Sequence, residues 1–138
     1  MENKFACDHI GIFTNNSKEL ENFYIKILEF KKEKEEILPK SIFRSIFEIA
    51  TDCRFIRLKT NNMKLEIFQP LSIRAKKRIN DMIGINHWGY CVANRKKFVQ
   101  KLKQKKVNVT EVKRNEHVIY FITDPDGNKI EIRKYYKK

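Results

Sequence analysis

Two histidines and two glutamates stand at matching points of a repeated pattern. The chain reads Asp8-His9-Ile10-Gly11-Ile12 near its start and Asn86-His87-Trp88-Gly89-Tyr90 later, and the strand-like runs Leu65-Glu66-Ile67 and Ile130-Glu131-Ile132 follow them. Imidazole nitrogen and carboxylate oxygen together suit Zn, Ni, Co, Mn or Fe(II). His9, Glu66, His87 and Glu131 are therefore candidate ligands of one divalent metal ion, a Lewis acid able to stabilise an enediolate.

The spacing of these residues supports a true repeat. Glu66 follows His9 by 57 residues and Glu131 follows His87 by 44, so the first copy needs an insertion of 13 residues. Residues 38–50 have no counterpart in the second half. One gap of the right size therefore brings the two copies into register.

Side-chain alternation places the four residues on comparable faces of their strands. Ile10 and Ile12 oppose His9, and the apolar neighbours of Glu66, His87 and Glu131 oppose those residues in the same way. Any one of the four could be an ordinary structural histidine or a solvated glutamate. Together they predict helices packed on the apolar faces, with the ligands on the opposite, concave face.

The coarse order of elements is the same in both halves. In the first half a strand over 5–14 precedes a helix with Ser17 as its N-cap, because apolar residues after Ser17 recur with helical spacing. Three further strands are expected there, and the second half repeats the order. The sequence predicts an α+β fold of two βαβββ modules forming a cup-shaped mixed sheet: a first module at 1–69 with the insertion 38–50, a helical linker at 70–84 and a second module at 85–138.

Composition limits the broad class of the protein. With 138 residues and 41% hydrophobic content, the chain can form a packed core. A net charge of +13 raises the question of nucleic acid, but no nucleic-acid-binding motif accompanies it. No apolar run is long enough for a membrane span, and no signal peptide is apparent, so we expect a cytoplasmic protein without nucleic-acid or membrane partners.

The remaining histidine and the cysteines are weaker candidates. Cys7, Cys53 and Cys91 are odd in number and lack a CxxC pair, which argues against a disulfide framework or a zinc knuckle. Alternation places Cys7 with His9 and Cys91 with His87, but free cysteines are usually small buried hydrophobes. His117 is expected at the surface beside a hairpin turn.

The chain resembles the vicinal oxygen chelate superfamily, which includes glyoxalase I, methylmalonyl-CoA epimerase, extradiol dioxygenases and fosfomycin-resistance enzymes. The resemblance covers nearly the whole chain and is carried by the 8–12, 65–67 and 86–89 stretches, Phe23-Tyr24 with Leu28, and Asp124-Pro125-Asp126-Gly127-Asn128 with Ile130-Glu131. It implies paired βαβββ modules around a metal ion, often with dimerisation helping to build the site.

Carried across residue by residue, the resemblance implies His9, Glu66, His87 and Glu131 as metal ligands and is closest to bacterial glyoxalase I. It implies a lyase of the lactoylglutathione lyase type, which isomerises a hemithioacetal by proton transfer through an enediolate, with Glu131 as the first choice of proton carrier and Glu66 as the second. A methylmalonyl-CoA epimerase-like isomerase and a non-catalytic binding protein of the bleomycin-resistance type are the alternatives. Phe13, where glutathione-using relatives tend to carry Arg, weakens the case for glutathione.

The expected substrate is a small molecule, either a thiol adduct or an acyl-thioester. Phe13 and Phe68 share the ligand-bearing faces and should flank the metal, and Arg133 should meet an anionic group near the rim. The 38–50 insertion is too apolar for a free loop. It should cover the pocket as a lid or pack against the second subunit of a homodimer.

Overall fold

The computed structural model describes residues 6–76 and 83–135, which divide into two compact units, Met1–Lys77 (unit 1) and Arg78–Lys138 (unit 2). Unit 1 holds six elements: β1 (His9–Phe13), α1 (Ser17–Leu28), β2 (Lys31–Leu38), α2 (Lys40–Phe47), β3 (Cys53–Lys59) and β4 (Lys64–Pro70). Unit 2 holds five: β5 (His87–Val92), α3 (Arg95–Gln104), β6 (Val109–Arg114), β7 (His117–Thr123) and β8 (Lys129–Lys134). None of the helices in the described part of the chain has the length and apolarity to cross a membrane.

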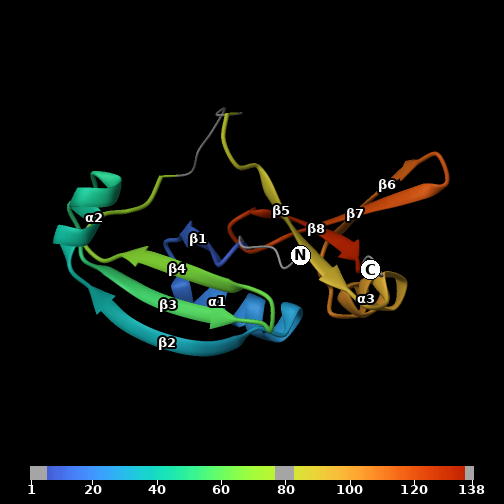
Figure 1. Ribbon diagram of the computed structural model, residues 1–138, viewed down its shortest axis with the longest axis horizontal. Helices are drawn as coiled ribbons and strands as arrows, with labels where there is room; N and C mark the ends of the chain where they lie inside the picture. Colours follow the sequence, from blue (N-terminus) through green and yellow to red (C-terminus); the bar gives the residue numbers. More distant parts are fainter. Residues whose placement is uncertain (1–5, 77–82, 136–138) are drawn as a thin grey trace. The chain divides into compact units, whose positions relative to one another are not determined.

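Each unit is a four-stranded mixed sheet with one helix on one face. The strand order is β1-β4-β3-β2 in unit 1 and β5-β8-β7-β6 in unit 2 (Figure 1). In both units the first strand pairs parallel to the last, and the remaining pairs are antiparallel. The predicted α+β fold of two βαβββ modules is confirmed.

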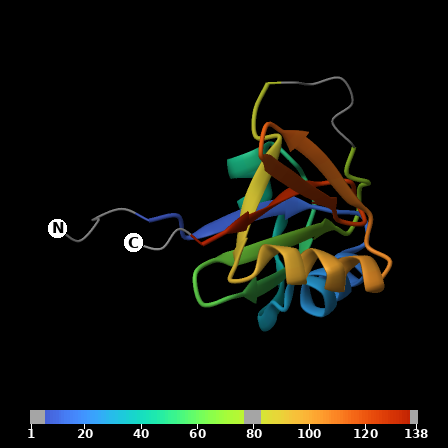
Figure 2. The same ribbon diagram turned by 90° about the vertical axis from the view of Figure 1, so that its right-hand side faces the viewer.

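The helix-facing side of the unit 1 sheet forms the main core. Leu20, Tyr24 and Leu28 of α1 are fully buried, and α1 lies against strands β3 and β4 (Figure 2). The strand residues beneath it, Ile56, Leu58, Leu65 and Ile67, are also buried. This is the apolar face that alternation predicts, so His9 and Glu66 lie on the opposite face.

The N-cap of α1 is Asn16, and the prediction of Ser17 was wrong by one residue. The Asn16 side chain accepts a hydrogen bond from the backbone N–H of Glu19, while Ser17 is the first helical residue and is buried. The Ser17 hydroxyl and N–H both donate to Oε1 of Gln69 on β4. Ser17 therefore joins the helix start to the sheet, and that tertiary contact occupies its side chain.

The 38–50 insertion contains α2, which packs at one end of the unit 1 sheet (Figure 1). Phe43 is its buried residue and contacts Phe13 and Phe68, with ring centroids 6.3 and 5.6 Å away. The backbone N–H of Lys40 donates to Asp52, which ties the beginning of α2 to the chain that follows it. Ile42 and Ile46 are exposed, and Phe47 is partly exposed while its ring contacts that of Phe13 at 5.2 Å.

The described parts of the 70–84 segment are not helical. Pro70 is the last residue of β4, residues 71–76 are bends and irregular chain, and so are residues 83 and 84. Residues 77–82 lie outside the described residues, so the predicted linker helix stays a prediction there.

Candidate metal centre

In unit 1, His9 and Glu66 face each other across two parallel strands. Their nearest atoms are Nε2 of His9 and Oε2 of Glu66, 3.4 Å apart. The other ring nitrogen, Nδ1, donates to Oδ2 of Asp8 at 2.8 Å. The pKa of the Asp8 carboxyl is lowered by that hydrogen bond and by Lys64, which keeps it an acceptor. His9 therefore presents Nε2 to Glu66.

Unit 2 repeats this arrangement with different supporting residues. Nε2 of His87 lies 3.6 Å from Oε2 of Glu131, and Nδ1 of His87 donates to the side-chain carbonyl of Asn86. The side chains of Glu66 and Glu131 are 13% and 19% exposed, and those of His9 and His87 are 44% and 41% exposed. Each pair combines a largely buried carboxylate with an accessible imidazole.

The hydrogen bonds at Nδ1 decide what these pairs can bind. With its proton on Nδ1, a neutral imidazole carries a lone pair on Nε2. That lone pair then faces a carboxylate oxygen, so two acceptors oppose each other unless a proton or a cation lies between them. Fixing Nδ1 through an oxygen acceptor is also how proteins orient metal-binding histidines.

The separations agree with a shared cation. At 3.4 and 3.6 Å, the Nε2–Oε2 distances exceed those of an ordinary N–H···O hydrogen bond. Two ligands each about 2.1 Å from one ion lie roughly 3.0 to 3.4 Å apart. The 3.4 Å separation in unit 1 lies at the upper end of this range and the 3.6 Å separation in unit 2 lies slightly beyond it, so the donors suit a divalent cation and would need only a small approach to share one.

The described residues contain two such pairs, one in each unit. Within residues 6–76 and 83–135, no three His, Cys, Asp or Glu side chains gather closely enough to hold a metal ion. Cys7 and Cys91 are exposed, and His117 is exposed at the start of β7. The structure thus places the four predicted ligands in two His–Glu pairs, one in each unit, and each pair with its supporting residues is called a half-site below.

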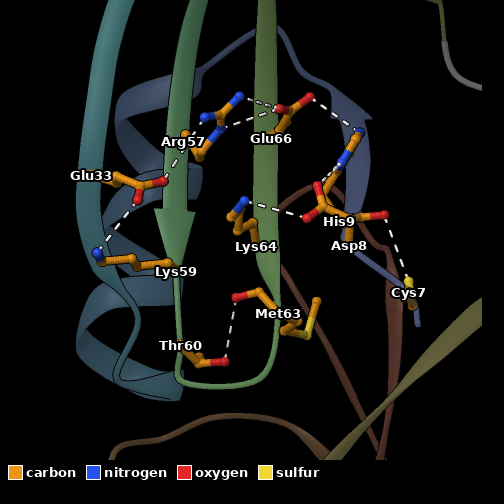
Figure 3. A network of polar contacts seen from close by, with 10 residues as sticks. All are labelled: Cys7, Asp8, His9, Glu33, Arg57, Lys59, Thr60, Met63, Lys64 and Glu66. Atoms are coloured by element: carbon orange, nitrogen blue, oxygen red, sulfur yellow. Dashed lines mark hydrogen bonds and ion pairs between the residues drawn. The ribbon is translucent and has the colours of Figure 1, made fainter. Parts of the chain in front are cut away.

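Arg57 is a site residue that the sequence reasoning missed. It stands directly opposite Glu66 in the β3–β4 register, and its Nε and Nη2 donate to Oε1 of Glu66 at 3.2 and 2.9 Å. Glu66 therefore directs one oxygen to Arg57 and the other to His9 (Figure 3). The Asn61-Asn62 turn was the available signal, because a hairpin centred on it pairs residues 57 and 66.

In unit 2 the arginine that contacts the glutamate comes from the same strand as the glutamate. Nη1 of Arg133 donates to Oε1 of Glu131 at 2.9 Å, so the predicted pocket residue Arg133 lies at the half-site. Phe121 occupies the register position opposite Glu131, and its ring lies 5.2 Å from that of His87. Phe121 was also missed, since its place depends on the β7–β8 pairing.

The predicted pocket residues Phe13 and Phe68 are packed together on the ligand face of unit 1. Their ring centroids are 5.6 Å apart, and Phe68 stacks on Phe55 at 5.4 Å. Phe43 of α2 packs against the same cluster. A Cβ on Gly11, between His9 and Phe13, would come 3.3 Å from Phe68. Glycine at this position thus leaves room for the Phe68 ring beside the His9–Glu66 pair.

Comparison with known protein families assigns the chain to one superfamily. The family described as the Glyoxalase/Bleomycin resistance protein/Dioxygenase superfamily matches residues 6–132, nearly the whole sequence. The protein belongs to this superfamily. The resemblance drawn from the repeated motifs is confirmed. A search of curated proteins finds no match.

Solved structures agree on the fold. A glyoxalase family protein from Enterococcus faecalis is 21% identical, with a TM-score of 0.69 over 90% of this chain and 93% of that one. The trypanothione-dependent glyoxalase I of Leishmania major is 19% identical, with a TM-score of 0.66 over 91% and 84%. TnmS3, an antibiotic binding protein from Streptomyces sp. CB03234, is 10% identical, with a TM-score of 0.64 over 99% and 100%. The superfamily fold thus carries both catalysis and binding.

Proposed function

We propose that this protein is a metal-dependent enzyme of the superfamily, in which His9, Glu66, His87 and Glu131 together hold one divalent cation, Ni, Zn, Co, Mn or Fe. The observation that carries the proposal is the repetition of one half-site in both units. In each, a histidine oriented through Nδ1 turns Nε2 toward a glutamate at 3.4 or 3.6 Å. The two pairs would meet within one chain or across a homodimer.

When bound, the cation would supply Lewis-acid stabilisation of negative charge on two adjacent substrate oxygens. Glu131 is the proposed carrier of the proton α to the carbonyl, and Glu66 is the second choice. A carboxylate largely shielded from water but close to substrate is suited to such transfer. Arg57 holds Glu66 through two N–H donors from the neighbouring strand, whereas Arg133 contacts Glu131 from the same strand, and we propose Glu131 as the proton carrier on the resemblance to glyoxalase I.

The reaction proposed first is that of a glyoxalase I-type lyase, the isomerisation of a hemithioacetal through an enediolate. The fold shared with the Leishmania major enzyme is compatible with it. An epimerase acting on an acyl-thioester would use the same proton transfer. The antibiotic binding protein TnmS3 has the same fold and supports binding without catalysis as the alternative.

Calorimetry on chelator-treated protein tests the metal proposal. We expect the parent to bind one Co²⁺ per completed site, and His87→Ala or His9→Ala to weaken binding at least tenfold. His117→Ala is the matched control, because His117 lies exposed on β7 outside both half-sites and should leave the affinity unchanged. Equal Co²⁺ affinity in His87→Ala and the parent would contradict the assignment.

Turnover assays separate the candidate reactions. The metal-loaded protein would be given methylglyoxal with several thiols and, separately, methylmalonyl-CoA. Hemithioacetal isomerisation would support the lyase and methylmalonyl-CoA racemisation the epimerase. Absence of both, with tight binding of an aromatic cation, would support the binding protein.

The exposed face of α2 bears on the proposed homodimer. Ile46 and Phe47 are 64% and 43% exposed beside the aromatic cluster, so this face is a subunit contact or the rim of a lid. Sedimentation of an Ile46→Asp variant distinguishes the two. A dimer that dissociates with unchanged ligand affinity indicates a subunit contact, and an unchanged size with weaker ligand binding indicates a lid.

A further inference from the structure

Helix α3 of unit 2 carries positive charge without any acidic residue. Residues 95–106, which are the helix and the two residues after it, contain seven basic residues and no aspartate or glutamate. Helix α1 has the corresponding place in unit 1, and between Ser17 and Leu28 it has two glutamates and two lysines. The repeat therefore has a helix of balanced charge in one unit and a strongly basic helix in the other.

The basic side chains of α3 lie on the side that is turned away from the sheet. Val99 and Leu102 are buried where the helix packs against β6 and β8 (Figure 1). The residues on the opposite side, called the outer side of α3 below, are all exposed: Lys96, Lys97, Gln100, Lys101, Lys103 and Gln104. None of these side chains is apolar or aromatic.

The lysines of the outer side form two rows. One turn of helix separates Lys97 from Lys101, so these two share one flank. About two turns separate Lys96 from Lys103, which share the other flank. The two exposed glutamines lie between the rows. The outer side of α3 thus has a neutral polar centre with positive charge on both flanks.

These charges lower the stability of the helix that carries them. Arg95, Lys96 and Lys97 occupy the first turn, where the helix dipole favours negative charge. Lys97 and Lys101 are also a like-charge pair one turn apart, which is destabilising. In the part of the chain that the structure describes, Lys103 has Glu111 of β6 as a partner, whereas Lys96 and Lys97 have no carboxylate partner. Proteins break such local rules of stability mainly at functional sites.

We propose that the outer side of α3 binds the phosphate backbone of B-form duplex DNA without reading its sequence. The major groove of B-DNA is about 12 Å wide and an α-helix is about 10 to 12 Å across, so the two rows of lysines would meet the phosphates on the two sides of the groove. The sequence contains no nucleic-acid-binding motif, but contacts with phosphates carry no sequence information and need none. This surface lies within unit 2 and is independent of the metal proposal.

The composition of the outer side distinguishes duplex DNA from other anionic partners. Binding in a membrane surface uses apolar side chains that insert among the lipids, and single-stranded nucleic acid is held by aromatic side chains that stack on its bases. The core of a protein interface is rich in aromatic residues. The outer side of α3 offers neither kind of side chain. An RNA duplex has a major groove too narrow for side chains to enter, which leaves B-form DNA as the best fit.

Fluorescence anisotropy of a labelled DNA duplex of about 20 base pairs tests the proposal with the full chain. Four lysine–phosphate contacts should make log Kobs fall with log [NaCl] with a slope of about −3.6. We expect Lys97→Gln/Lys101→Gln to weaken binding about tenfold in about 50 mM NaCl and to reduce the slope by about 1.8, because two contacts are lost. A second duplex of unrelated sequence should bind within about twofold of the first.

Lys18→Gln/Lys26→Gln on α1 is the matched control. It changes the net charge of the protein by the same amount, and Lys18 and Lys26 are exposed on the corresponding helix of unit 1. DNA affinity in this variant should stay within about twofold of the parent. Thermal unfolding should show that Lys97→Gln/Lys101→Gln is at least as stable as the parent, since it removes a like-charge pair. A loss of DNA binding in that variant then does not come from unfolding.

A loss of affinity and of salt slope confined to the α3 variant would support the proposal. Equal losses in the α1 and α3 variants would overturn it, because net charge alone would then explain binding. Absence of DNA binding in about 50 mM NaCl would also overturn it. The same holds if an RNA duplex, single-stranded DNA or vesicles containing phosphatidylserine bind as tightly as the DNA duplex, or if the two duplexes differ clearly in affinity.

Discussion

In unit 1 the residue opposite Glu66 on the neighbouring strand is Arg57, whereas in unit 2 the residue opposite Glu131 is Phe121. Two residues beyond each glutamate the types are reversed, with Phe68 in unit 1 and Arg133 in unit 2. Each unit thus surrounds its own His–Glu pair with one arginine and one phenylalanine, and the two residue types have exchanged positions between the units. In both units an arginine contacts the glutamate carboxylate, and a hydrogen bond at Nδ1 orients the histidine ring. More than one pattern of residues therefore produces the same arrangement.

The two units also differ in what covers the ligand face. Unit 1 carries α2, whose Phe43 completes a cluster with Phe55 and Phe68. Unit 2 has only a short connection between β6 and β7, and its strand β6 is mostly exposed. Unit 1 therefore has a second apolar layer on the ligand side of its sheet, in addition to the core under α1.

The largest expected effect distinguishes the two glutamates. Under the proposed lyase reaction, Glu131→Gln should lower kcat for hemithioacetal isomerisation about a thousandfold, because an amide cannot carry the proton. Glu66→Gln should lower kcat less, since the same proposal gives Glu66 the role of a metal ligand held in place by Arg57. Stopped-flow assays at saturating metal measure both. A larger loss in Glu66→Gln would reverse the assigned roles.

The second prediction concerns the added layer of unit 1. Phe43→Ala should destabilise the protein by about 3 kcal/mol, because a fully buried ring leaves a cavity that its neighbours only partly fill. Urea unfolding followed by circular dichroism measures the change. Ile46→Ala, on the exposed side of the same helix, is the control and should change the stability by less than about 0.5 kcal/mol. Similar values for both variants would mean that α2 is not packed on the sheet.

The third prediction uses the reactivity of the cysteines to test the packing of α2 in unit 1. Burial raises the pKa of the Cys53 thiol to about 11, and Cys53 lies in the Phe43 cluster. Iodoacetamide at pH 8 should therefore alkylate Cys53 at least a hundredfold more slowly than the exposed Cys7 and Cys91. Mass spectrometry of timed digests measures the rates. Phe43→Ala should speed Cys53 labelling, and equal rates in the native parent would contradict the packing.

The smallest expected effect compares the two helix starts. Helices α1 and α3 both have an Asn as N-cap, Asn16 and Asn94. The third residue after the cap is Glu19 in α1 and Lys97 in α3. A positive charge in the first turn opposes the helix dipole. Lys97→Glu should therefore stabilise the protein by about 0.5 kcal/mol, and Glu19→Lys should destabilise it by a similar amount. Thermal unfolding at low salt measures both, and a loss of the difference at high salt confirms its electrostatic origin.

Much of the fold could be predicted from the sequence because its signals are local. Alternation along each strand assigns Ile67 to the core and Glu66 to the other face, and helical spacing finds Leu20, Tyr24 and Leu28. The repeat located the insertion, and the structure shows that it contains the helix α2. The N-cap was misplaced because the contact that occupies Ser17 comes from Gln69, far along the chain.

The sequence by itself determined that each half carries one histidine and one glutamate on the face of a sheet turned away from its helix, because the alternation of side chains is a property of the strand backbone. The tertiary structure decided what surrounds them. The β3–β4 register set Arg57 against Glu66, and the packing of α2 brought Phe43 onto the cluster with Phe68. These contacts depend on strand pairing and on shape complementarity between distant segments, which no local pattern encodes.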